Sequence, residues 1–191
     1  FDIIKDRDGH LWIGTRGDGI YIDNEHYTSK DPIHKIPADM VYDIVQDKMG
    51  RIWLASWEKG LLMTDGKKKP YQFVAFLNKH LGQSRIHDLE MDSHGILWIA
   101  TCDGIYSIDT KRKNLSEKDF KHFGTSNHQL SGDEVICLQS TPQGKLYAGI
   151  TGEGLVECHI DKQGNITKQE VISESLRINT NIVNSISQDR L

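Results

Sequence analysis

A short phrase recurs four times in this chain: a glycine, any residue, an aliphatic residue, a large aromatic residue and, two positions later, a small residue. The glycines at positions 9, 50, 95 and 144 lie 41, 45 and 49 residues apart. Repeats with a period of roughly 20–50 residues mark solenoids, propellers and similar arrays, because one unit cannot bury its apolar face without a neighbour. The aromatic residues of the phrase are Trp12, Trp53, Trp98 and Tyr147.

Each copy contains sequence for four short strands. In the second copy an alternating stretch at residues 41–47 precedes a turn, Asp47–Gly50, and the aromatic strand follows it. Asp at the first position and Gly at the fourth suit a type I turn, and the period of two with β-branched residues favours strands. A glycine-rich turn and a third strand come next. A more variable fourth strand is expected at residues 71–76, 120–123 and 166–171.

Four short strands in each repeat of this length predict one propeller blade. A solenoid of βα units fits less well, because no segment of helical period recurs; a single helical turn is expected at residues 76–81. The predicted fold is an all-β propeller of about four blades plus one strand, part of a larger ring. The predicted repeats cover residues 1–38, 39–83, 84–132 and 133–180, with the first strand of a further repeat in 181–191.

The copies resemble the two-component-regulator propeller repeat. Residues 6–20 match its pattern, Asp-x-x-Gly-x-Leu-Trp-Ile-Gly-Thr-x-x-x-Gly-Ile, almost residue for residue, and residues 92–105 match with one residue missing. Residues 47–61 and 141–155 are looser copies; the latter has Thr141 for Asp and Tyr147 for Trp. The chain begins within an expected strand, so we expect it to be a piece of a longer protein.

The resemblance implies a place in the periplasmic sensor region of a hybrid two-component histidine kinase of Bacteroidetes. Such regions form seven-bladed propellers, followed by an immunoglobulin-like domain and a membrane span, and many respond to oligosaccharides. The implied partners are an oligosaccharide ligand, the remaining blades and the downstream receptor domains. An open propeller also exposes strand edges and apolar faces, which favours pairing with another copy, so a homodimer is a further expectation.

Composition narrows the function classes. The formal net charge is −4 and the only basic run is Lys67-Lys68-Lys69, expected at a solvated hairpin tip, so nucleic acid is not an expected partner. No stretch is long and apolar enough to span a bilayer, and no signal peptide is visible. The cysteines form no Cys-x-x-Cys pair and are expected to be small buried residues: Cys102, Cys137 and Cys158.

Signals for catalysis are few. The chain has no Gly-x-Ser-x-Gly, no His-Glu-x-x-His and no phosphate-binding glycine loop, so we expect no catalytic residue, metal or cofactor. A propeller lyase or glycosidase is the alternative function. It would need acids or histidines on the inner strands, where the candidates are Asp43, Asp88 and His87. Asp43 and Asp88 occupy aligned positions, which favours a structural role. A protein-binding scaffold is a third hypothesis.

The fourth tryptophan breaks the repeat pattern. Trp12, Trp53 and Trp98 recur once per blade and are expected in the core, whereas Trp57 lies in a glycine turn. This turn is on the propeller face that usually carries ligands, where an indole can stack on a sugar ring; packing on a neighbouring loop is the alternative. The predicted ligand-contacting surface comprises Trp57, Glu58, Lys59, Arg16, Asp18, Arg85, Asp103, Asp133 and Glu153, with Asp39 and Asn181 on the same face.

Overall fold

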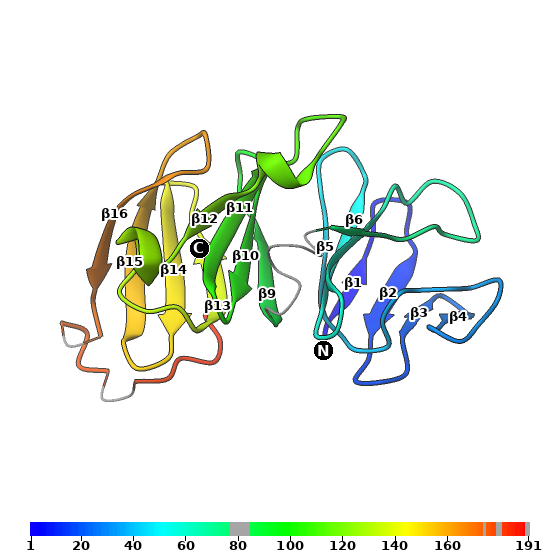
Figure 1. Cartoon of the computed structure of the whole chain (residues 1–191), viewed down its shortest axis with the longest axis horizontal. Coiled ribbons are helices and arrows are strands. Elements are labelled where there is room, and N and C mark those ends of the chain that lie inside the picture. Colours follow the sequence, from blue (N-terminus) through cyan, green and yellow to red (C-terminus); the bar gives the residue numbers. More distant parts are fainter. Residues whose placement is uncertain (77–84, 174, 179–180, 190–191) are drawn as a thin grey trace. The chain divides into compact units, whose positions relative to one another are not determined.

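The computed structural model describes residues 1–76, 85–173, 175–178 and 181–189. These residues form four four-stranded antiparallel sheets and no α-helix, and each sheet takes its strands in chain order (Figure 1). The prediction of an all-β propeller is therefore confirmed. None of the described helices is long and apolar enough to cross a membrane.

Each sheet is one blade. Blade 1 contains β1 (Ile3–Lys5), β2 (Leu11–Gly14), β3 (Ile20–Ile22) and β4 (Glu25–Tyr27). Blade 2 contains β5 (Val41–Gln46), β6 (Ile52–Ser56), β7 (Gly60–Thr64) and β8 (Val74–Phe76). Blade 3 contains β9 (Ile86–Met91), β10 (Ile96–Thr101), β11 (Gly104–Asp109) and β12 (Lys121–Phe123). Blade 4 contains β13 (Val135–Ser140), β14 (Lys145–Ile150), β15 (Gly154–Ile160) and β16 (Ile166–Val171).

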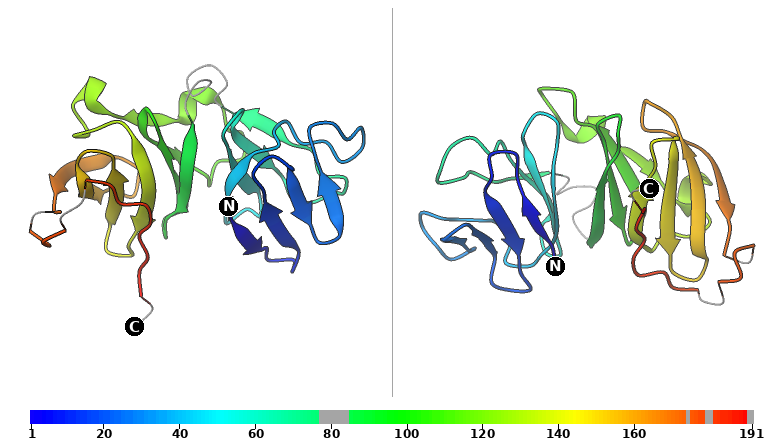
Figure 2. Two further views of the ribbon diagram at one scale, coloured as in Figure 1. Left: turned by 90° about the horizontal axis from the view of Figure 1, so that it is seen from below. Right: turned by 180° about the vertical axis from the view of Figure 1, so that it is seen from behind.

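Two single-turn 3-10 helices flank β12: η1 (Glu117–Asp119) and η2 (Thr125–Asn127). The chain divides into two compact units, Phe1–Ile86 and His87–Leu191, which we describe separately. Two blades stand side by side within each unit (Figure 2). The predicted fourth strands at 71–76 and 120–123 are shorter in the structure, and the helical turn expected at 76–81 lies almost wholly outside the described residues.

The repeated tryptophans are core residues, as predicted, and each is fixed by the aspartate of its own turn. Trp12, Trp53 and Trp98 are fully buried. Their indole N–H groups donate to Oδ2 of Asp6, Asp47 and Asp92 at 2.8, 3.0 and 3.0 Å. The other oxygen of each carboxylate accepts two backbone N–H groups of the turn. One buried carboxylate therefore links the turn to the core in each of the first three blades.

Trp12 and Trp98 each pack against the blade that follows their own. Trp12 packs 5.0 Å, centroid to centroid, from Tyr71, in a cluster with Ile44, Ile52 and Leu54 of blade 2. In the second unit Trp98 belongs to a cluster that contains residues of β13, β14 and β15. Burial between successive blades is therefore the main source of cohesion within each unit.

The small residue beside the aromatic ring is explained by the next repeat. At Gly14 an added Cβ would lie 2.8 Å from the carbonyl oxygen of Val41, and at Gly149 it would overlap the carbonyl oxygen of Val183. Both glycines let the following segment of backbone approach closely, which is a packing requirement of the blade-to-blade junction.

Blade 4 departs from the buried Asp–Trp pair. Thr141 and Tyr147 replace the two residues, and the Tyr147 hydroxyl donates to Oε2 of Glu157 at 2.9 Å. Lys145 Nζ donates to the same oxygen at 2.9 Å. The face of blade 4 that carries Tyr147 therefore has polar side chains. The equivalent faces of blades 1 and 3, which carry Trp12 and Trp98, belong to buried hydrophobic clusters.

The first strand of a further repeat is expected within residues 181–191, and the described residues 181–189 form no strand. The first of these residues nevertheless contact blade 4 in the way that the start of a repeat contacts the blade before it. The carbonyl of Asn181 accepts the Gly152 N–H at 2.8 Å, just as the carbonyl of Asp39 accepts the Gly17 N–H at 2.9 Å. Residues 181–183 thus lie on blade 4 in the way that residues 39–41 lie on blade 1.

Candidate ligand-binding site

Four side chains of the first unit form a continuous stack, which we term the aromatic column: Phe1, Tyr42, Trp57 and Arg85. The Phe1 and Tyr42 rings are stacked with centroids 5.2 Å apart. The Tyr42 and Trp57 centroids are 5.3 Å apart, and the guanidinium carbon of Arg85 lies 4.2 Å from the Trp57 ring centroid. Trp57 and Arg85, both predicted as ligand contacts, are thereby brought together.

The local backbone explains how the column forms. The pairing of β5 with β6 shifts register between Val41 and Asp43, so Tyr42 occupies a β-bulge, a feature that redirects a side chain. The backbone N–H of Trp57 donates to the carbonyl of Met40 at 3.3 Å, which brings the β6–β7 turn alongside the start of β5. Within that turn the N–H groups of residues 58 and 59 donate to the Ser56 hydroxyl. The turn is therefore held by hydrogen bonds at both of its ends.

The column presents both apolar and charged surface. Phe1 is 62% exposed and Arg85 is exposed, whereas Tyr42 and Trp57 are partly buried. Glu58 and Lys59, which follow Trp57 in the same turn, are exposed. Since the guanidinium of Arg85 covers part of the Trp57 ring, a ligand that stacks on the indole must displace it or bind against it. Aromatic faces with adjacent charged groups suit a flat ligand that also carries hydroxyls.

The backbone of Arg16 lies beside the column, since Arg16 forms an isolated bridge with Met40, whose carbonyl accepts the Trp57 backbone N–H. Asp18 accepts a hydrogen bond from the Tyr21 hydroxyl at 2.6 Å, and His26 Nε2 lies 3.4 Å from the same carboxylate. These contacts fasten the glycine turn of blade 1 to its two outer strands.

The second unit repeats this arrangement. Asp103 accepts from the Tyr106 hydroxyl at 3.1 Å, and the His122 ring lies tilted against Tyr106 with centroids 4.5 Å apart. The recurrence of the same three residue types in two blades favours a structural role. Glu153 is partly buried, and its backbone carbonyl accepts from the Ser173 hydroxyl at 3.2 Å.

Asp39 and Asp133 use both carboxylate oxygens internally. Asp39 accepts from the Ser29 N–H and hydroxyl at 2.7 and 2.5 Å. Asp133 accepts from the Thr125 N–H and hydroxyl at 2.7 and 2.5 Å. The Thr125 hydrogen bonds hold the pKa of Asp133 below its usual value. Each carboxylate ties the loop after a fourth strand to the start of the next repeat, and this leaves less capacity for a ligand.

The two inner-strand carboxylates considered for catalysis, Asp43 and Asp88, both accept backbone N–H groups, and that of Asp88 connects blade 3 to blade 4. Asp88 Oδ2 accepts the Leu138 N–H at 2.6 Å, and Asp2 Oδ2 accepts the Ile44 N–H at 3.3 Å. Asp43 Oδ1 accepts the Ile44 N–H at 2.8 Å. Within the described residues no three His, Cys, Asp or Glu side chains are placed to hold a metal ion.

Two of the three cysteines, Cys137 and Cys158, are buried, as expected, and Cys102 is partly buried. Burial raises the pKa of the Cys158 thiol to about 12 and that of Cys137 to about 11. These two thiols are therefore protonated near neutral pH and poor nucleophiles.

A cavity of about 760 Å³ lies on the face of blade 4 that carries Tyr147. Its lining includes Lys145, Tyr147 and Glu157 of the blade and Ile172, Ser175, Leu176, Ile186, Ser187 and Gln188 of the segments that follow it. Tyr147 occupies the position of Trp12 and Trp98, which pack against a following blade. Because the equivalent surfaces are blade-packing surfaces, we do not assign this cavity to a ligand.

Sequence reasoning missed Phe1 and Tyr42. Tyr42 is the second residue of β5, Phe1 aligns with it in the first repeat, and the later repeats have His87 and Ile136 at this position. An aromatic residue at this position in only two adjacent repeats was a signal in the sequence, but it becomes informative only when the bulge and the neighbouring turn are known.

Comparison with known proteins identifies the repeat. Residues 1–17, 35–58 and 80–103 match the family described as two component regulator propeller. No curated protein sequence matches the chain significantly.

Solved structures share the fold. The extracellular domain described as the hybrid two component system BT3049 of B. thetaiotaomicron aligns with a TM-score of 0.68 and 21% identity, over 91% of this chain and 22% of that one. That of BT4673 from the same organism aligns with a TM-score of 0.68 and 18% identity, over 87% and 24%. A virginiamycin B lyase from Staphylococcus aureus aligns with a TM-score of 0.55 and 14% identity, over 86% and 53%. The chain thus spans less than a quarter of the first two proteins.

Proposed function

We propose that this chain, which carries two-component regulator propeller repeats, is part of an extracytoplasmic sensor that binds an oligosaccharide through its aromatic column. The extracellular domains of BT3049 and BT4673 support the sensor assignment, since they share its blades. In this proposal the remaining blades and the downstream receptor domains complete the protein, and ligand binding alters domain arrangement or dimer geometry.

The observation that carries the proposal is the stack of Phe1, Tyr42, Trp57 and Arg85. Three aromatic rings in a row are unusual at a surface unless they pack on a neighbour or contact a ligand. Sugar rings present flat C–H faces that pack on aromatic rings, while their hydroxyls need hydrogen-bonding groups at the edge. Arg85, Glu58 and Lys59 supply such groups.

Binding is tested with the whole chain on a glycan array, followed by calorimetric titration of the strongest oligosaccharide. We expect Trp57→Ala to weaken binding about tenfold or more, since loss of one stacked aromatic is worth roughly 1 kcal/mol beyond its buried area. Tyr21→Ala is the matched control, because Tyr21 is an aromatic residue of the same unit outside the column.

Equal affinity of the Trp57→Ala variant and the unmodified chain, with unchanged circular dichroism, would refute the proposal. A propeller enzyme is the second candidate, since the fold is shared with a lyase. Mass analysis of the bound oligosaccharide after prolonged incubation distinguishes the two, because turnover would show product and simple binding would not.

A further inference from the structure

The second unit contains a cavity where the loop between β11 and β12 meets the β15–β16 hairpin. These two segments and the end of β11 enclose a cavity of about 470 Å³, lined by Ser107, Asp109, Lys111, Arg112, Asp119, Lys121, Lys162 and Gln163. This volume is within the range of roughly 300–1,000 Å³ typical of small-molecule sites.

The floor of this cavity is firmly built. The Ser107 hydroxyl donates to the carbonyl of Gly164 at 2.7 Å, and an added Cβ at Gly164 would lie 2.9 Å from Ile96. Lys121 Nζ donates to the carbonyl of Gln163 at 2.7 Å and to Oδ1 of Asn165 at 2.6 Å. The hairpin of blade 4 is therefore anchored to blade 3, and the cavity walls hold a fixed separation.

The lining is strongly basic in a chain whose net charge is −4. Four cationic side chains and two carboxylates line the cavity. Arg112 donates to Oδ1 of Asp119 at 2.5 Å, and Lys111 Nζ lies 3.7 Å from Oδ1 of Asp109, an exposed contact longer than a hydrogen bond. Both carboxylates also accept hydrogen bonds within the loop. Asp119 accepts from the Ser116 N–H and hydroxyl, each at 2.8 Å, and Asp109 accepts the Lys111 N–H at 3.0 Å. A net positive charge remains at the cavity.

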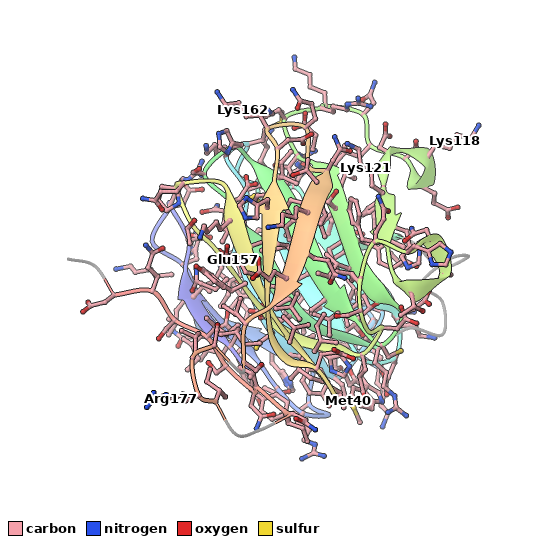
Figure 3. All side chains as sticks on the ribbon, turned by 90° about the vertical axis from the view of Figure 1, so that its left-hand side faces the viewer. Met40, Lys118, Lys121, Glu157, Lys162 and Arg177 are labelled. Carbon is pink, nitrogen blue, oxygen red and sulfur yellow. The ribbon has the colours of Figure 1, made fainter. Side chains whose placement is uncertain are left out.

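Lys162 and Lys121 lie at the same end of this unit, whereas Lys118 of η1 projects away from them (Figure 3). Lys162 is exposed on the hairpin and Lys111 is exposed on the opposite loop. Ammonium groups carried by separate segments of a cavity lining suit a tetrahedral oxyanion better than a flat ring, because each acts as a point charge with three donors.

The geometry points to a binding site for a small ligand that carries a sulfate or phosphate ester. Its oxyanion binds between Lys111 and Lys162, and the polar groups of the cavity contact the rest of a molecule about the size of one sugar. The site shares no residue with the aromatic column, so this inference can be tested independently of the proposed function.

Calorimetric titration of the whole chain with glucose 6-sulfate and with glucose 6-phosphate tests this inference, and glucose serves as the uncharged control. We expect saturable binding of at least one ester and none of glucose. The double variant Lys111→Gln, Lys162→Gln is expected to weaken it about tenfold, because each lost charge-assisted bond contributes of order 1 kcal/mol.

The matched control is Lys113→Gln with Lys118→Gln, which removes two charges from the same basic segment without altering the cavity lining. Unchanged affinity in this control supports a built site, and the ester bound more tightly identifies the oxyanion. An equal loss in both double variants would show a diffuse electrostatic attraction and overturn the inference, as would a lack of saturable binding by either ester.

Discussion

The buried Asp92–Trp98 pair allows a quantitative prediction for the variant Asp92→Asn. Asp92 is 3% exposed and accepts three hydrogen bonds, from the N–H groups of His94 and Ile96 at 2.8 and 2.9 Å and from the Trp98 indole at 3.0 Å. Asparagine has the same shape but only one acceptor oxygen. If that oxygen keeps the two backbone bonds, the amide NH₂ must face the indole N–H.

The cost follows from this juxtaposition of two buried donors. A hydrogen bond to a charged acceptor contributes roughly 1.5–3 kcal/mol, and an unpaired buried donor costs roughly 1–3 kcal/mol. These contributions overlap, because the lost bond is what leaves the donor unpaired. We therefore expect Asp92→Asn to lower the free energy of unfolding of the second unit by about 2–4 kcal/mol.

Urea titration followed by hydrogen exchange of β10 and β11 measures the stability of this unit without relying on Trp98 fluorescence. A double-mutant cycle with Trp98→Phe, which removes the indole donor, isolates the pair, and we expect a coupling energy of about 1–2 kcal/mol. Asp103→Asn is the control: its side chain is 53% exposed, and we expect a change within about 0.5 kcal/mol. A cost of Asp92→Asn below about 1 kcal/mol, or strict additivity in the cycle, would refute the reasoning.

Three further predictions concern the second unit. Burial raises the pKa of Glu90, whose Oε1 accepts hydrogen bonds from the Ser140 N–H and hydroxyl. The folded state therefore favours the protonated carboxyl, and this group stabilises the fold only as the pH falls through its raised pKa. Glu90→Gln is expected to be more stable than the unmodified chain at pH near 7, with the advantage in urea unfolding shrinking toward about pH 4; a pH-independent difference would contradict this. Thr125→Val removes a hydrogen bond to Asp133, so carboxyl NMR is expected to show that the lowered pKa of Asp133 rises. On acidification the stability that this carboxylate gives is then lost at a higher pH than in the unmodified chain. An unchanged titration of Asp133 would contradict the prediction. Gly149→Ala would push an added Cβ into the backbone of residue 183, and hydrogen exchange of the glycine turn after β14 is expected to accelerate, whereas unchanged protection would show that the segment can shift without cost.

The fold was predictable because its determinants are local and repeated. Each turn aspartate, each left-handed glycine and each tryptophan recurs at a fixed spacing, as at Asp47, Gly50 and Trp53. The hydrogen bond between the aspartate and the indole of the same blade was not predicted, since the turn and the core were considered separately.

The candidate site was only half predictable. Trp57 was identified because it breaks the repeat, and Arg85 because it aligns with the start of a strand. Tyr42 was missed because its direction depends on a bulge that alternation does not reveal. The basic cavity was also missed, since it joins Lys111 to Lys162, which belong to successive blades and are far apart in the sequence.

The docking of residues 181–183 has a consequence for how such chains should be divided. The carbonyls of Asp39, Asp133 and Asn181 each accept an N–H from the glycine turn of the preceding blade. The first residues of each repeat therefore complete the hydrogen bonding of the blade before it. The boundaries of the sequence repeat do not coincide with the boundaries of the hydrogen-bonded blade. An excision that ends at the last strand of a blade removes these carbonyls, whereas one that extends a few residues further retains them.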